Sequence, residues 1–291
     1  MNKTLHKIYI GSFFLVGITV LVLLGINGYS YYTIPIEERF FHSSHQSLKP
    51  SGIWGHGFGI IGTLMMICGV SIYMIRKRSR RFFTFGYLKH WLEFHIFLCA
   101  VGPILVLYHT SFKFGGIVSV SFWSMVLVVL SGIIGRFIYI QIPRTIQGKE
   151  LDVQELNSMR QQMSHNLYID STMSLKFTKD YERFSSLEKY ANLGIIKSLV
   201  VIFADYFRIK ILVYKINKQL KESGVSAYRI KEILRTVKTE IVLTRRIGLL
   251  KTMQKLFRYW HIAHLPFAIT MFVIMIIHVA VTVIFGYKWI F

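Results

Sequence analysis

The sequence predicts an all-α polytopic membrane protein, on three observations. First, 53% of its 291 residues are hydrophobic, and its mean hydropathy is +0.46. Second, several apolar runs reach the roughly 20 residues that a helix needs to cross a bilayer. Third, the formal net charge is +21, as expected of inward-facing loops that contact anionic lipid. No nucleic-acid-binding motif accompanies this charge, so membrane lipid is the expected partner and nucleic acid is not.

Five apolar runs are long enough to be membrane-spanning helices. They cover residues 8–26, 53–75, 88–110, 117–142 and 260–285. The first run follows a short basic start and lacks a small-residue cleavage site, which indicates a retained anchor rather than a signal peptide. A shorter run at 194–207 holds Lys197 and Asp205 between basic flanks. It is predicted to be an amphipathic helix on the inner membrane surface.

The charge pattern orients these helices and divides the chain. Five cations and no acid occupy residues 76–81, and the segment 144–259 has 22 Lys and Arg against 11 Asp and Glu. Because basic loops stay on the cytoplasmic side, both segments are predicted to lie inside a cell inner (cytoplasmic) membrane. The expected parts are a first transmembrane helix (1–28), an extracytoplasmic loop (29–52), transmembrane helices two to four (53–143), a basic helical cytoplasmic insertion (144–259), and a fifth transmembrane helix with an extracytoplasmic C-terminus (260–291).

Two of these helices carry a pair of histidines at the same spacing. His95 and His109 lie fourteen residues apart, and so do His264 and His278. Fourteen helical residues rise roughly 21 Å and return to nearly the same face of the helix. Each helix therefore offers one imidazole toward each side of the membrane. Polar groups inside a bilayer are costly, which makes such residues functional candidates.

The spacing predicts two haem groups, each held by two histidines, because neutral imidazole nitrogen is a common axial ligand of haem iron. Both helices run from the inner to the outer side. His95 therefore pairs with His264 at an inner haem, and His109 pairs with His278 at an outer one. Two imidazoles per iron suit electron transfer better than oxygen binding. The sequence has no Cys-x-x-Cys-His motif, so both haems are expected to be non-covalent b haems.

Three further residues are candidate cofactor contacts. Gly102 lies seven residues from each histidine of its helix, where a missing side chain would admit a large group. Arg136 lies near the depth of His95, where a haem propionate or the inner interface would satisfy its charge. His56 lies near the depth of His109 and is a candidate to bond a propionate or a quinol.

Other residues of these helices have alternative explanations. Gly55 and Gly69 are also fourteen residues apart, but glycine is common in membrane helices for packing alone. Glu93 is expected to point away from the ligand face. It is either a carboxylate at headgroup level or a proton carrier to an inner quinone site. His90 lies at the inner end of its helix without a matched spacing and is expected to be interfacial.

The motifs His95-x13-His109 and His264-x13-His278 resemble those of the di-haem membrane cytochromes b. One branch is the quinol-oxidising cytochrome b of bc-type complexes. Its ligand helices run in the opposite direction, and its Pro-Glu-Trp-Tyr motif is missing here. The ferric reductase/NADPH oxidase transmembrane domain is more similar, although its flavin and nicotinamide domains have no counterpart in these 291 residues. The resemblance covers residues 53–142 and 260–285 and leaves out the insertion.

This resemblance implies a four-helix haem-binding bundle that carries electrons across the membrane, as a subunit of a quinone-linked or respiratory oxidoreductase. The implied partners are an iron–sulfur, flavin or c-type cytochrome subunit, and a quinone is a further candidate cofactor. The basic insertion would dock an acidic partner or bind lipid headgroups. Two other interpretations stay open. One is a proton- or metal-translocating transporter that uses the intramembrane histidines, and the other is an assembly protein that recruits partners through its insertion.

Overall fold

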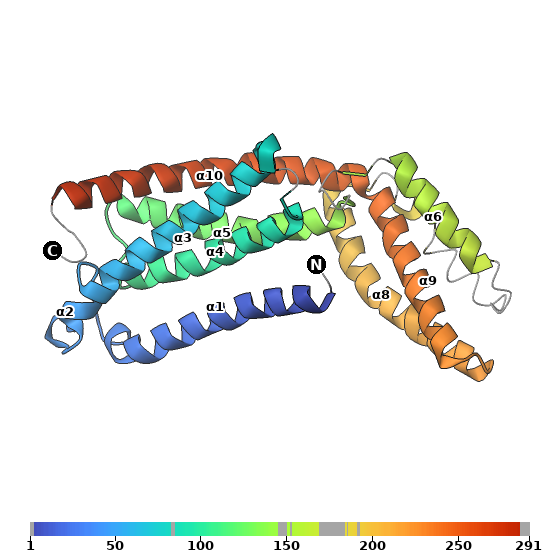
Figure 1. The fold of residues 1–291 in the computed structure, drawn as a ribbon, viewed down its shortest axis with the longest axis horizontal. Coiled ribbons are helices and arrows are strands. Elements are labelled where there is room, and N and C mark those ends of the chain that lie inside the picture. Colours follow the sequence, from blue (N-terminus) through green and yellow to red (C-terminus); the bar gives the residue numbers. More distant parts are fainter. Residues whose placement is uncertain are drawn as a thin grey trace. The chain divides into compact units, whose positions relative to one another are not determined.

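Figure 1 shows the fold of the protein, a computed structural model. The structure describes residues 3–82, 85–144, 150–151, 153–168, 184, 186–190 and 193–285. Within these ranges the regular structure is helical, apart from an isolated antiparallel bridge between Arg144 and Glu150. The α-helices are α1 (Lys3–Tyr32), α2 (His45–Leu48), α3 (Ile53–Arg78), α4 (Leu88–His109), α5 (Val118–Gln141), α6 (Val153–Tyr168), α8 (Ile195–Glu222), α9 (Ala227–Gly248) and α10 (Leu250–Ile284). The 3-10 turns are η1 (Arg39–Phe41), η2 (Arg80–Phe82) and η3 (Glu188–Tyr190).

In the described ranges, α1, α3, α4, α5 and α10 are long and apolar enough to cross a membrane. Many of their large apolar side chains are exposed, as expected of surfaces that contact lipid tails. This confirms the predicted all-α class and makes the chain a multi-pass membrane protein. The predicted span 260–285 is only the second part of a longer helix, because α10 already begins at Leu250.

The chain forms two compact units. The first holds α1 to α4, α5 as far as Ile134, and α10 from Ile262 onward. The second holds the remaining parts of α5 and α10 together with α6, α8 and α9. The four predicted histidine ligands all belong to the first unit.

Within the first unit, α3 and α4 pack together through glycines. A methyl group added at Gly62 would lie 2.7 Å from the carbonyl oxygen of Gly102, and one added at Gly102 would lie 2.8 Å from that of Gly62. Small residues allow this close approach of two helices in a membrane. Pro103 lies inside α4 and does not interrupt it. The two helices therefore form a tight pair that crosses at Gly62 and Gly102.

Long flexible side chains fill the middle of the first unit, between this pair and α5 and α10. We call this cluster the methionine layer; it consists of Met66, Phe122, Met125, Met271 and Met275. Met271 lies seven residues from both His264 and His278, at the midpoint of their spacing. The Ser121 hydroxyl donates a 3.0 Å hydrogen bond to the carbonyl oxygen of Met271, which ties α5 to α10. Methionine adapts well to irregular gaps, which suits it to this position.

The second unit is built on the buried face of α8. One apolar cluster joins α8 to α9, and its members are Ile209, Leu212, Ile216, Leu220, Ile230, Ile233, Val237 and Ile241. The opposite face of α8 also carries large apolar side chains, all of them exposed: Ile196, Val200, Phe203, Phe207, Ile211 and Tyr214. These six recur every three or four residues, so they lie on one side of the helix. α8 is not among the candidate membrane spans of the described residues, and its predicted place on the membrane surface stays a prediction.

A buried carboxylate connects α8 to η3 in the second unit. Asp205 is fully buried, and Lys189 Nζ lies 3.0 Å from its Oδ1 atom. The hydroxyl of Tyr190 donates a 2.7 Å hydrogen bond to Oδ2. Burial, together with the neighbouring Asp205 carboxylate, raises the pKa of Tyr190 far above its ordinary value, so this hydroxyl remains a donor. The acidic residue of the predicted run 194–207, Asp205, is thus paired with Lys189 inside the second unit.

Candidate functional site

His109, near the end of α4, is tied to the backbone of α3. Its Nδ1 atom lies 2.8 Å from the carbonyl oxygen of Gly55. A carbonyl oxygen only accepts hydrogen bonds, so Nδ1 carries the proton and Nε2 keeps a free lone pair. Gly59 makes room for the ring, because a methyl group there would lie 2.8 Å from His109 Cγ. This tether orients Nε2 as a metal-ligating atom in the way that metal-binding histidines are usually oriented.

His95 shows the same arrangement fourteen residues earlier on α4. Its Nδ1 atom lies 3.1 Å from the carbonyl oxygen of Gly69, so Nε2 is again the free nitrogen. The ring stacks on Tyr73, with centroids 5.3 Å apart. The fourteen-residue spacing of Gly55 and Gly69 therefore matches that of the two histidines on α4. The backbone carbonyl groups at these two positions of α3 therefore hold both rings.

His264 on α10 is tied to α5 through a hydroxyl. Its Nδ1 atom lies 2.6 Å from Ser131 Oγ. The Ser131 hydroxyl donates its proton to the carbonyl oxygen of Val128, at 2.9 Å. With that bond in place, Oγ accepts a hydrogen bond from the Nδ1 proton of His264. Three of the four predicted ligands are thus fixed in the same tautomer by three different partners.

The structure brings the predicted outer ligands together. The ring centroids of His109 and His278 lie 6.4 Å apart, with an interplanar angle of 57°. Two imidazoles that bind one metal ion from opposite sides, each at about 2 Å, hold their centroids roughly 6 Å apart. The ring of His56 lies 6.3 Å from that of His109, so this third predicted residue also lies at the outer pair.

The predicted inner ligands are positioned separately. His95 contacts Gly69, Tyr73 and Cys99. Within the described residues, the rings of His95 and His264 do not touch one another. The pairing of these two residues therefore stays a prediction, although each ring has its Nδ1 atom held.

Two further predicted contacts have other surroundings. The space beside Gly102 is taken by the methionine layer and α3, because an added methyl group would lie 2.9 Å from Met66 Cγ. Gly102 is thus a packing position between α3 and α4, and its predicted contact with a cofactor stays a prediction. Arg136 belongs to the second unit, where its guanidinium lies 5.7 Å from the centroid of the Tyr139 ring. Its predicted contact with a propionate stays a prediction.

The donor set fits haem iron. All four histidines are half-buried in apolar helices, and imidazole nitrogen is an ordinary ligand for this iron. The methionine layer lies between the two levels of histidines along α10, which keeps the two candidate sites apart. Sequence reasoning missed the role of Ser131 and of the glycine carbonyls. The matched spacing of Gly55 and Gly69 was the signal that pointed to the carbonyls.

The fold and this site define an all-α, multi-pass membrane protein with tethered imidazoles inside its helices. Comparisons of the chain with protein families, with curated proteins and with solved structures give no match.

Proposed function

We propose that the protein is a membrane-integral di-haem b cytochrome that carries electrons across the membrane. The observation that carries this proposal is the pair His109 and His278, whose ring centroids lie 6.4 Å apart. The hydrogen bond from His109 to Gly55 leaves Nε2 free to bind iron. The same tether at His95 supports a second site at the other level.

His109 and His278 would hold the outer haem, and His95 and His264 would hold the inner one. Each haem supplies a one-electron redox centre. The chain would supply four imidazole nitrogen atoms to the two haems, in an apolar surrounding, and three of the four rings are held at Nδ1. Gly55, Gly69 and Ser131 set the orientation of three of these rings.

Electrons must enter and leave through other molecules. A membrane quinone, or an iron–sulfur, flavin or c-type cytochrome subunit, would serve as donor or acceptor. The basic segment 144–259 offers a docking surface for an acidic partner on the inner side of the cytoplasmic membrane. Two histidine levels roughly 21 Å apart along the helices would carry charge over most of the bilayer core.

The proposal is tested by the visible spectrum and haem content of the purified protein. The reduced protein should show the sharp α-band of bis-histidine haem b, and the pyridine haemochrome assay should count two haems per chain. A folded protein without this absorbance would contradict the proposal. It would favour the alternative of a transporter that moves protons or metal ions along its histidines.

Single variants then test the ligands. His109→Ala and His278→Ala should each remove about one haem per chain. Because both substitutions should remove the same haem, the double variant should lose no more haem than either single variant. His42→Ala is the matched control, because His42 lies in the loop before α2, where its ring contacts Tyr31 and its Nδ1 atom accepts a hydrogen bond from the Ser44 backbone. A His278→Ala variant that keeps both haems would contradict the proposed pairing.

A further inference from the structure

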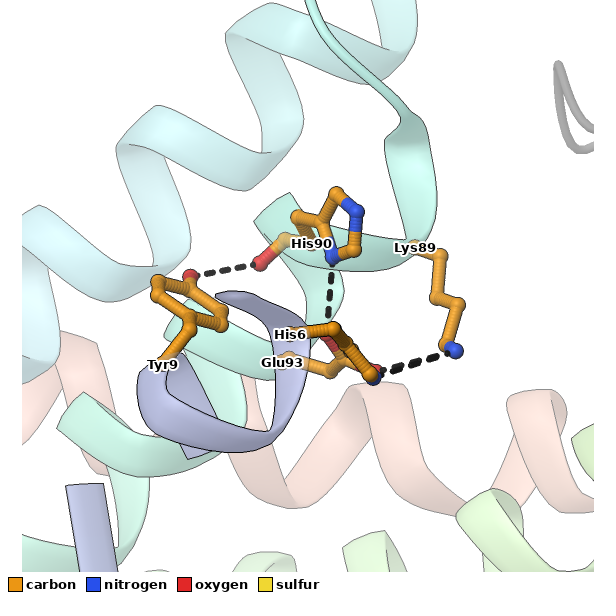
Figure 2. A network of polar contacts seen from close by, with 5 residues as sticks. All are labelled: His6, Tyr9, Lys89, His90 and Glu93. Atoms are coloured by element: carbon orange, nitrogen blue, oxygen red, sulfur yellow. Dashed lines mark hydrogen bonds and ion pairs between the residues drawn. The ribbon is translucent and has the colours of Figure 1, made fainter. Parts of the chain in front are cut away.

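A second cluster of ligand-type side chains lies at the amino-terminal end of α4, as Figure 2 shows. His90 and Glu93 lie three residues apart, on one face of α4. His6 reaches them from α1. His90 Nδ1 lies 3.0 Å from Glu93 Oε2, and His6 Nε2 lies 3.7 Å from Glu93 Oε1. One donor atom from each residue lies within 4.8 Å of the other two.

This cluster already holds a cation. The ammonium nitrogen of Lys89 lies 3.6 Å from Glu93 Oε1 and 3.4 Å from His6 Nε2. These are two of the atoms that a bound metal ion would contact. The Lys89 side chain is 54% exposed, and it is long enough to swing into solvent. A metal ion could therefore replace the ammonium without moving either helix.

The surroundings favour such an exchange. Glu93 is only 8% exposed, and a buried carboxylate is stable only with a cation or hydrogen-bond donors beside it. The Nδ1 atom of His6 is buried and has no hydrogen-bond partner among the described residues. No bond at that atom therefore resists the small ring rotation that would bring Nε2 to a metal ion. The Tyr9 hydroxyl donates a 3.1 Å hydrogen bond to the carbonyl oxygen of His90, which holds α1 against α4.

We infer that His6, His90 and Glu93 form a binding site for a divalent first-row transition metal ion. Two imidazoles and one carboxylate are a known three-ligand set for zinc and iron(II), with a position left open for water or another ligand. The two nitrogen donors disfavour magnesium and calcium, which prefer oxygen. At bond lengths of about 2.0–2.2 Å, the donors around a tetrahedral ion lie roughly 3.3–3.6 Å apart. The separations of 3.0 and 3.7 Å are close to this spacing, and they join the two imidazoles to the two different oxygen atoms of the Glu93 carboxylate.

A bound ion would join α1 to α4 at one end of the first unit. α1 supplies one ligand and α4 supplies two. The inference does not depend on the haem proposal, because none of the three residues is a predicted haem ligand.

The test is a titration of the purified full chain with Zn²⁺, by calorimetry and by metal analysis after dialysis. The parent should bind one Zn²⁺ more per chain than His6→Gln, and Glu93→Gln should lose the same ion. Loss of a ligand should weaken binding by at least about 10- to 100-fold, the range seen when supporting residues of metal sites are removed. His261→Ala is the matched control. His261 lies on α10 and is not a member of this cluster, so this variant should bind Zn²⁺ like the parent.

A variant of Lys89 tests the same site in the opposite direction. Lys89→Met removes the competing ammonium and should strengthen Zn²⁺ binding about tenfold. A misfolded protein would not gain affinity, so this result also guards against variants that lose the site by unfolding. Equal Zn²⁺ affinity in the parent, His6→Gln and Glu93→Gln would overturn the inference. Weaker or unchanged binding by Lys89→Met would overturn it as well.

Discussion

The hydrogen bond between Ser131 and His264 should set the redox potential of one haem under the proposed function. Replacing Ser131 by alanine removes the oxygen that lies 2.6 Å from Nδ1. An imidazole whose Nδ1 proton is shared with an acceptor donates more electron density to the iron. Because this stabilises the oxidised iron, losing the acceptor should raise the midpoint potential.

The size of the shift follows from the strength of the bond. A hydrogen bond of this kind contributes about 0.5–1.5 kcal/mol. For a one-electron couple, 59 mV corresponds to about 1.4 kcal/mol, so Ser131→Ala should raise one potential by about 20–60 mV. The other haem should keep its potential, because its ligand His109 is tied to the Gly55 carbonyl and not to Ser131. Ser131→Thr keeps the oxygen atom and should restore the parent value.

Redox titration of the α-band measures both potentials in one experiment. Ser121→Ala is the matched control, since Ser121 also bonds α5 to α10 but contacts the Met271 carbonyl instead of a histidine. A shift in Ser121→Ala as large as that in Ser131→Ala would refute the reasoning. So would unchanged potentials in Ser131→Ala when haem is retained.

Three other substitutions, one of them with a matched control, test the packing. Gly59→Ala should displace the His109 ring, because the added methyl group would lie 2.8 Å from Cγ; pyridine haemochrome should then count about one haem fewer, and a full count would contradict the placement of the ring. Gly102→Ala should cost about 1–3 kcal/mol in denaturation experiments by overpacking against α3. Gly132→Ala, which meets nothing within 4 Å, should cost far less, and equal losses would argue against the tight helix pair. Asp205→Asn should destabilise the second unit by about 3 kcal/mol, since it leaves Lys189 without its carboxylate; amide exchange in α8 should speed up, and unchanged rates would show that this pair is not structural.

The length of the apolar runs in the sequence was enough to predict a multi-pass membrane protein. Apolar length predicted the five spans, because a bilayer demands about 20 apolar residues of any helix that crosses it. The helix that contains the last predicted span begins ten residues before it, at Leu250 rather than at 260. The membrane boundary sets where a helix becomes apolar, but backbone hydrogen bonds continue across it. Polar residues before Trp260 therefore extend the helix without showing where it begins.

The candidate site was only partly predictable. The ligand spacing is visible within single helices, but the tethers depend on how neighbouring helices are placed in register. The sequence could not show that the Gly55 carbonyl meets His109, or that Ser131 meets His264. Nor could it show that α3 and Met66 lie against Gly102. The contact of His6 with Glu93 joins residues 87 positions apart, and only the folded chain shows it.

The two carbonyl tethers have a consequence for how this chain tolerates insertions and deletions. One residue added to or removed from α3 between Gly55 and Gly69 would turn one carbonyl by about 100° and shift it by 1.5 Å relative to the other. α3 could then place a carbonyl oxygen at hydrogen-bonding distance from His95 or from His109, but not from both. Many side chains of α3 are free to vary, whereas its residue count between these two glycines is not. The number of residues between Gly55 and Gly69 on α3 must therefore equal the number between His95 and His109 on α4, although α3 contributes no predicted haem ligand.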